Sequence, residues 1–137
     1  MTDLSLTMQI SAAGMRAQGE RLRVIAENLA NAQSTGMSPD ELPYRRQTVG
    51  FQSVLDRAAG VSLVEATDPR ADPSQFIRRH EPHHPAADPE GYVMYPNVNS
   101  LVEMMDMREA QRSFEANLSV IESSRQMLAR TIDLLRA

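Results

Sequence analysis

Apolar side chains recur at helical spacing near both ends of this 137-residue chain. Near the N-terminus, one line repeats every seven residues and consists of Met8, Met15, Leu22 and Leu29. Near the C-terminus, such a line consists of Met107, Phe114, Ile121, Leu128 and Leu135, with Leu101, Met104, Leu118 and Ile132 beside it. This periodicity predicts one amphipathic helix over about residues 4–33 and another from residue 100 onward. At about 1.5 Å per residue, these helices would be about 45 and 55 Å long.

The predicted helix ends carry residues that commonly start or stop helices. Asp3 is a candidate N-cap of the first helix, and Gly36 is a candidate C-terminal stop. Ser100 and Glu103 have the spacing of a capping box directly before the apolar pattern of the second helix begins.

Neither helix is expected to be self-sufficient. Gly14 and Gly19 each weaken the first helix by about 1 kcal/mol relative to alanine. Two helices can pair as a hairpin, but a pair cannot enclose a core, so parts of both apolar lines stay open. Apolar surface of that kind predicts association with other copies or other chains.

All eight prolines lie between Pro39 and Pro96, so the middle of the chain differs from both ends. Residues 45–55, 61–66, 76–80 and 91–95 have the composition of short strands, and 68–73 and 88–91 that of turns. The X-Pro steps predict a stiff, extended lead-in over residues 81–99. The expected organisation is an N-terminal core helix (1–35), an extended and β-hairpin middle (36–99) and a C-terminal core helix (100–137). The predicted fold class is mainly α, with two terminal helices forming a coiled-coil-like hairpin.

Composition and charge exclude several classes of protein. There is no cysteine, which excludes disulfides, thiolate catalysis and Cys-ligated metals. A net charge of −4 does not indicate the basic surface that is typical of nucleic-acid-binding proteins. The N-terminal stretch lacks the basic start and apolar core of a cleaved secretory signal, and no run is long enough to predict a membrane span.

The three histidines, His80, His83 and His84, stand close together and raise the question of a metal or catalytic site. Pro82 and Pro85 prevent a continuous helix that would align them as ligands. No nucleophile motif and no Gly-rich phosphate loop is present. We therefore expect no catalytic, metal or cofactor site and no small-molecule substrate. A histidine-loop metalloprotein and a self-contained helical-hairpin adaptor are the competing hypotheses.

Several motifs resemble the proximal rod proteins of the bacterial flagellar basal body, the FlgC family. The run "GYVMYPNVN", then "EMMDM", then "AQRSFEAN" is similar to the C-terminal signature of that family. "NLANAQSTG" resembles an element shared across flagellar axial proteins, and "YRRQTVGF" resembles the element that follows it. Residues 53–75 carry little of the resemblance, and another axial or rod component is the alternative within this superfamily.

The resemblance implies a structural subunit for motility, without enzymatic activity. Such proteins are exported by the flagellar type III apparatus without a cleaved signal. They assemble helically, through terminal helices that pack as coiled coils, into the hollow, torque-transmitting rod that spans the periplasm. The implied partners are other copies of the chain, other rod proteins, and MS-ring and export-gate components at the rod base.

The residues expected to form the assembly interface come from the apolar lines and from the resembling motifs. For Asn28, Asn31 and Asn117, hydrogen bonds between subunits compete with a solvated polar face; for Tyr44, Arg45 and Arg46, an inter-subunit contact competes with a solvated loop. The full predicted set is Met8, Met15, Leu22, Asn28, Leu29, Asn31, Tyr44, Arg45, Arg46, Tyr92, Pro96, Asn97, Asn99, Met104, Met107, Phe114, Asn117, Leu118, Ile121, Leu128 and Leu135.

Overall fold

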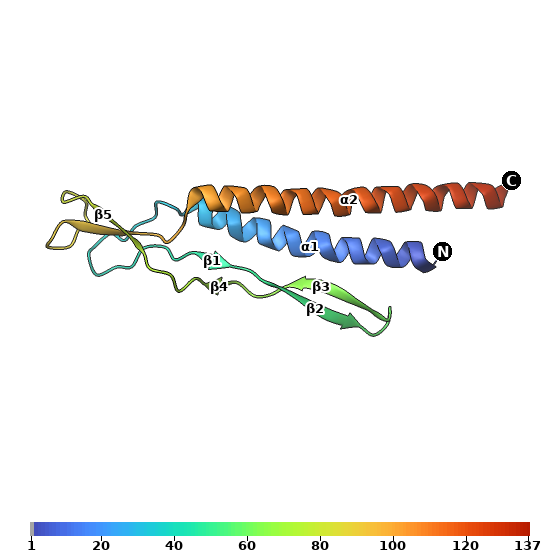
Figure 1. The fold of residues 1–137 in the computed structure, drawn as a ribbon, viewed down its shortest axis with the longest axis horizontal. Helices are drawn as coiled ribbons and strands as arrows, with labels where there is room; N and C mark the ends of the chain where they lie inside the picture. Colours follow the sequence, from blue (N-terminus) through green and yellow to red (C-terminus); the bar gives the residue numbers. More distant parts are fainter. Residues whose placement is uncertain (1) are drawn as a thin grey trace. The chain divides into compact units, whose positions relative to one another are not determined.

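A computed structural model describes residues 2–137 and contains two long helices with short strands between them (Figure 1). The helices are α1 (Thr2–Ala30) and α2 (Ser100–Arg136). The strands are β1 (Gln47–Thr48), β2 (Phe51–Asp56), β3 (Val61–Ala66), β4 (Arg70–Ala71), β5 (Ile77–His80) and β6 (Tyr92–Tyr95). The predicted plan of two terminal helices flanking a small β-containing middle is confirmed. Neither helix within residues 2–137 is apolar enough over a sufficient length to span a bilayer.

The described residues form two compact units, and each helix contributes to both. Unit 1 contains residues 2–22, 50–68 and 108–137, whereas unit 2 contains residues 23–49 and 69–107. Each unit therefore combines parts of α1, of the middle segment and of α2.

Unit 1 is built around the hairpin of β2 and β3, which pair antiparallel from Phe51↔Ala66 to Asp56↔Val61. Asp56 closes the turn, because its Oδ1 accepts the backbone N–H groups of Ala58 (2.9 Å) and Ala59 (3.2 Å). Its other oxygen accepts a hydrogen bond from Gln9 Nε2 of α1 at 2.9 Å, which fastens the hairpin to the helix. One carboxylate thus both shapes the turn and positions it.

Unit 2 contains two further antiparallel ribbons, β1 with β4 and β5 with β6. Its small apolar core consists of Ala86, Val93 and Tyr95, with Ala87 packed against them. Tyr95 also donates its hydroxyl to Glu81 Oε2 at 2.8 Å, so this core residue keeps a polar partner.

The buried line of α2 is small and polar. It repeats every seven residues and consists of Glu103, Ala110, Asn117 and Ser124, of which Asn117 is half-buried. In unit 1, Asn117 lies against Gly14 of α1, since a Cβ added at Gly14 would be only 2.8 Å from Asn117 Nδ2. In unit 2, Glu103 lies against Asn28 of α1. The helices therefore meet through small and polar side chains.

The large apolar residues predicted as the helix seam lie beside this line. Met8, Met15, Leu22 and Leu29 are half-buried, as are Met107, Phe114, Ile121 and Leu128. Others are exposed, and these are Leu101 (68%), Met104, Leu118, Ile132 and Leu135 (77%). The apolar periodicity identified the helices correctly. The contact between α1 and α2, however, uses the neighbouring small and polar line of α2.

The predicted helix ends need correction. Asn99, not Ser100, caps α2, because its Oδ1 accepts the backbone N–H groups of Leu101 (3.1 Å) and Val102 (3.4 Å). The carboxylate of Glu103 is buried and bonded elsewhere, so the predicted capping box does not form. The candidate N-cap Asp3 lies inside the first turn of α1.

Gly36 has a different role from the predicted helix stop. α1 ends at Ala30, six residues earlier. A Cβ at Gly36 would lie 2.5 Å from the carbonyl oxygen of Glu41, so only glycine allows this close approach of two backbone segments.

The predicted extended lead-in is wrong in its first half. Between β5 and β6 the chain folds into successive turns, in which the N–H groups of His84, Ala87 and Gly91 bond to carbonyls three residues earlier. The proline rings set φ values that suit turns as well as extended chain, and the turn bonds satisfy the backbone locally. The predicted turn at 88–91 is confirmed by the Gly91 N–H to Asp88 O bond of 2.9 Å.

The two glycines of α1 offer a matched test of the helix contact. Gly19→Ala is expected to raise the free energy of unfolding by about 1 kcal/mol, because an added Cβ meets nothing within 4 Å and alanine favours the helix. Gly14→Ala should raise the free energy of unfolding by less than Gly19→Ala, or should lower it, because Asn117 must shift. Urea unfolding of both variants and of Gly14→Ala/Asn117→Ala measures the difference, and equal gains at both glycines would contradict the close contact.

Candidate assembly interface

Asn28 is the polar centre of unit 2, and its side chain is 1% exposed. Its Oδ1 accepts hydrogen bonds from the Tyr44 hydroxyl (2.8 Å) and the Gln47 N–H (2.9 Å). Its Nδ2 donates to the Gln47 carbonyl (2.8 Å) and to Glu103 Oε2 (3.4 Å). All four hydrogen-bonding positions of the amide are used. Asn28 thereby pairs with the backbone of β1 as a neighbouring strand would.

Tyr44 is held in one protonation state by this arrangement. Burial raises the pKa of Tyr44, and the nearby carboxylates of Glu27 and Glu103 raise it further because a phenolate would face their negative charge. The hydroxyl therefore stays a donor to Asn28 at neutral pH.

Arg46 neutralises a group of carboxylates. Its Nε donates to Glu103, which is 1% exposed, while other guanidinium nitrogens lie 3.0 Å from Asp72 and 3.8 Å from Asp106. Burial lowers the pKa of Arg46, but hydrogen bonds to Glu103 and Asp72 outweigh this and leave the pKa raised. A buried carboxylate is tolerated only with such a partner.

A second arginine and an asparagine hold the segment around residues 72–74 against the same unit. Arg45 donates to the carbonyls of Asp72 (2.7 Å) and Ser74 (2.9 Å), and its guanidinium lies 4.1 Å from the Phe76 ring centroid. Asn97 donates to the same two carbonyls at 3.1 and 3.2 Å and accepts the N–H of Arg46 at 2.8 Å. The sequence interpretation favoured contacts between subunits for Tyr44, Arg45 and Arg46; the structure shows contacts within the subunit.

The remaining motif residues have local roles. Asn31 donates to the Glu27 carbonyl at 2.9 Å, where α1 ends, and Asn117 donates to the Ser113 carbonyl at 3.0 Å. Tyr92 lies 4.5 Å beneath the Arg78 guanidinium, and Pro96 is fully buried. Asn28 is thus the one asparagine of its motif that joins separate elements, since Asn31 bonds near its own helix end.

His80 ends strand β5, whereas His84 lies in the turns that follow it. His84 Nδ1 accepts the N–H of Ala86 at 3.0 Å, and its Nε2 lies 3.3 Å from Thr35 Oγ1. His80 packs edge-on against Tyr92, with ring centroids 5.0 Å apart. Across residues 2–137, no group of three His, Cys, Asp or Glu side chains is placed to hold a metal ion.

Sequence reasoning missed the acidic half of this network. Glu103 was assigned to a cap and Asp72 to a turn, and Asp106 and Gln47 were not singled out. Glu103 stands seven residues before Ala110, but only the structure shows that this line of α2 is buried.

The motif asparagines provide a matched pair of variants. Asn28→Ala leaves the N–H and C=O of Gln47 without their partner, so we expect a loss of about 1–3 kcal/mol in the free energy of unfolding. Asn31→Ala removes a bond within one helix end and should cost well under half as much. Chemical unfolding followed by circular dichroism gives both values, and a smaller loss at Asn28 than at Asn31 would refute the assigned role.

The network also predicts acid sensitivity. The backbone N–H and hydroxyl of Ser74, together with Arg46, lower the pKa of Asp72 below its usual value. A carboxyl whose folded pKa is depressed stabilises the fold above its unfolded pKa of about 4, and this stabilisation is lost as pH falls through the folded pKa. Asp72→Asn should therefore lose about 1 kcal/mol at pH 7, begin to converge with the parent protein below about pH 4 and meet it below the folded pKa. The exposed Asp40→Asn should track the parent throughout urea titrations between pH 7 and 3; a constant gap for Asp72→Asn would contradict the linkage.

Comparison with known proteins gives a consistent result. Residues 90–134 match the family described as flagellar basal body rod FlgEFG protein C-terminal. The flagellar basal-body rod protein FlgC of Agrobacterium fabrum is 49% identical over 137 residues, covering 100% of this chain and 99% of the relative. The FlgC proteins of Escherichia coli O6:H1 and Aquifex aeolicus are 38% and 36% identical, covering 91% and 97% of this chain and 92% and 98% of the relatives. The chain belongs to the FlgC family of flagellar basal-body rod proteins and is a structural subunit of the rod.

Proposed function

We propose that the chain assembles helically with other copies of itself and with other rod proteins through α1 and α2, as a coiled-coil-like layer of a hollow, torque-transmitting shaft. The observation that carries this proposal is the exposed apolar surface of α2. Besides the residues named above, it includes Val102, Met105, Val120, Met127 and Leu134. Apolar surface of this extent on one helix is typical of a face that a partner covers.

Two different sets of residues on α2 are buried within the chain and exposed at its surface. The line of Glu103, Ala110 and Ser124 is buried within the chain, whereas Leu101, Met104 and Leu118 remain exposed. Since the small line already contacts α1, the large residues are available to neighbouring subunits. Export by the flagellar type III apparatus, a place in the periplasm and contacts with the MS ring and export gate rest on family membership alone.

The proposal is tested in a strain that lacks the gene and carries variants of it. Met104→Glu and Leu118→Glu place a charge on the exposed apolar face, so we expect normal helix content in the purified chain but no swimming and basal bodies that stop before the rod. Gln126→Glu, at an exposed polar position of the same helix outside the line of Met104 and Leu118, should support swimming. Swim plates and electron microscopy of basal bodies give the result, and normal rods from both apolar-face variants would refute this interface.

A further inference from the structure

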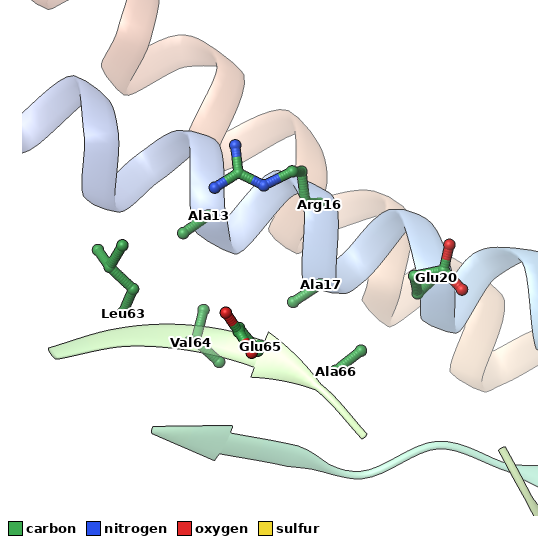
Figure 2. A pocket seen from close by; sticks show the side chains of 8 residues that line it. All are labelled: Ala13, Arg16, Ala17, Glu20, Leu63, Val64, Glu65 and Ala66. Atoms are coloured by element: carbon green, nitrogen blue, oxygen red, sulfur yellow. The ribbon is translucent and has the colours of Figure 1, made fainter. Parts of the chain in front are cut away.

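The space between α1 and β3 in unit 1 is closed by the chain itself. Ala13 and Ala17 point from α1 toward β3, and both are buried, so the strand already covers this face of the helix (Figure 2). A pocket that is open to a partner lies in unit 2 instead.

The pocket in unit 2, here called the Arg45 pocket, has a volume of about 330 Å³. Its apolar walls are Pro73, Phe76 and Met94, which come from the segment before β5 and from β6. Its charged lining residues are Arg45 and Arg78, and no carboxylate of the described residues lines it. The pocket therefore combines apolar surface with positive charge.

The two arginines of the pocket differ in how their charge is balanced. Arg78 lies 3.5 Å from a carboxylate oxygen of Asp88 and 3.9 Å from one of Glu90. Arg45 forms no ion pair within residues 2–137, because its printed bonds run from Nη1 to two backbone carbonyls. Arg45 is thus the cation of the pocket that lacks a carboxylate partner.

The guanidinium of Arg45 is oriented so that one edge stays available. The ring of Phe76 covers one of its faces, with the central carbon 4.1 Å from the ring centroid, and the two carbonyls hold Nη1. The N–H groups of Nε and Nη2 have no partner in the described part of the chain. These two nitrogens form the edge of the planar fork that a carboxylate binds with two parallel hydrogen bonds. The pocket therefore suits a carboxylate that is flanked by apolar side chains.

The chain itself presents such a group on the turn of residues 37–42. The Glu41 N–H donates to the Ser38 carbonyl at 3.2 Å, and the Glu41 carboxylate accepts the Met37 N–H at 2.8 Å, so the turn is held by its own bonds. Met37 and Leu42 are 79% and 65% exposed on either side of Asp40. Large apolar residues so exposed on a short turn are typical of a surface that a partner covers.

Asp40 has no use within its own subunit. It is exposed, and it forms no hydrogen bond or ion pair within residues 2–137, with Arg45 or with any other residue. The turn therefore offers an unpaired carboxylate between two apolar side chains, and the Arg45 pocket offers an unpaired cation between apolar walls. This complementarity of charge and of apolar surface identifies a second copy of the chain as the occupant.

We propose that the 37–42 turn of one copy docks in the Arg45 pocket of a second copy. The Asp40 carboxylate binds the Nε–Nη2 edge of Arg45, and Met37 and Leu42 pack against the apolar walls. A partly exposed ion pair contributes little free energy, so the apolar contacts provide most of the attachment, and the charges select the orientation. This inference rests on the proposed assembly function and specifies one contact between neighbouring copies.

Cross-linking tests the contact directly, because the chain has no cysteine of its own. A strain that lacks the gene produces two full-length chains with tags of different size, one with Ser38→Cys and one with Gln75→Cys. Both positions are exposed, and Gln75 lines the pocket. A short bis-maleimide is added to isolated basal bodies. We expect at least tenfold more mixed dimer than from Ser38→Cys with Arg57→Cys, an exposed position in unit 1.

Charge reversal tests the ion pair with a matched control. Asp40→Lys places a cation against Arg45, so we expect at least tenfold fewer completed rods by electron microscopy, with unchanged helix content in the purified chain. Asp68→Lys makes the same change in net charge at an exposed aspartate of unit 1 and should give normal rods.

The two experiments separate the docking contact from the assembly function. If basal bodies contain both cysteine chains but no mixed dimer forms, or if Asp40→Lys gives normal rods, the docking contact is wrong and the assembly function stands. If the unaltered chain is absent from basal bodies, the assembly function itself fails. If Asp40→Lys does not fold, the cross-linking result decides.

Discussion

The buried carboxylate of Glu103 is the constraint on which unit 2 depends. An ionised carboxylate removed from water costs several kcal/mol unless a cation and hydrogen-bond donors replace the solvent. Here Arg46 supplies the cation and Asn28 supplies a donor. Because Arg46 lies directly before β1, satisfying Glu103 also fixes the start of that ribbon. Asn97 then bonds to the Arg46 N–H, so the segment leading into α2 is held by the same residue.

The burial of the polar network within the chain determines which side chains of α2 remain exposed. The contact between α1 and α2 uses Gly14, Asn117 and Asn28, which bury little apolar area. The larger side chains of α2 then have no place in that contact and lie on its flanks or in the open. An isolated subunit of this kind has a modest core, and its apolar surface favours association over solitary stability. This agrees with a protein whose family builds a multi-subunit rod.

The sequence predicted what repeats locally and missed what depends on distant partners. Seven-residue spacing identified both helices, and the Asp-Pro-Glu-Gly run identified a turn. In each case the residues that make up the signal are close together in the sequence. Glu103 looked like a capping residue, since its partner Arg46 is 57 positions away and nothing local marks the pair. Gly14 looked like a weakness of the helix, and only the position of Asn117 explains it. Asn28 was selected through resemblance, but its pairing with the Gln47 backbone required the structure.

The Gly14–Asn117 contact has a consequence for how the two helices can move. Sliding α2 by one turn would bring Asn117 opposite a residue with a Cβ, whereas at Gly14 even an added Cβ would lie only 2.8 Å from the Asn117 Nδ2. Leucine side chains between two helices can pack in several registers of similar energy. An amide side chain that fits only over a single glycine allows one register. Every copy of the chain that folds with this contact therefore presents its two terminal helices in the same register.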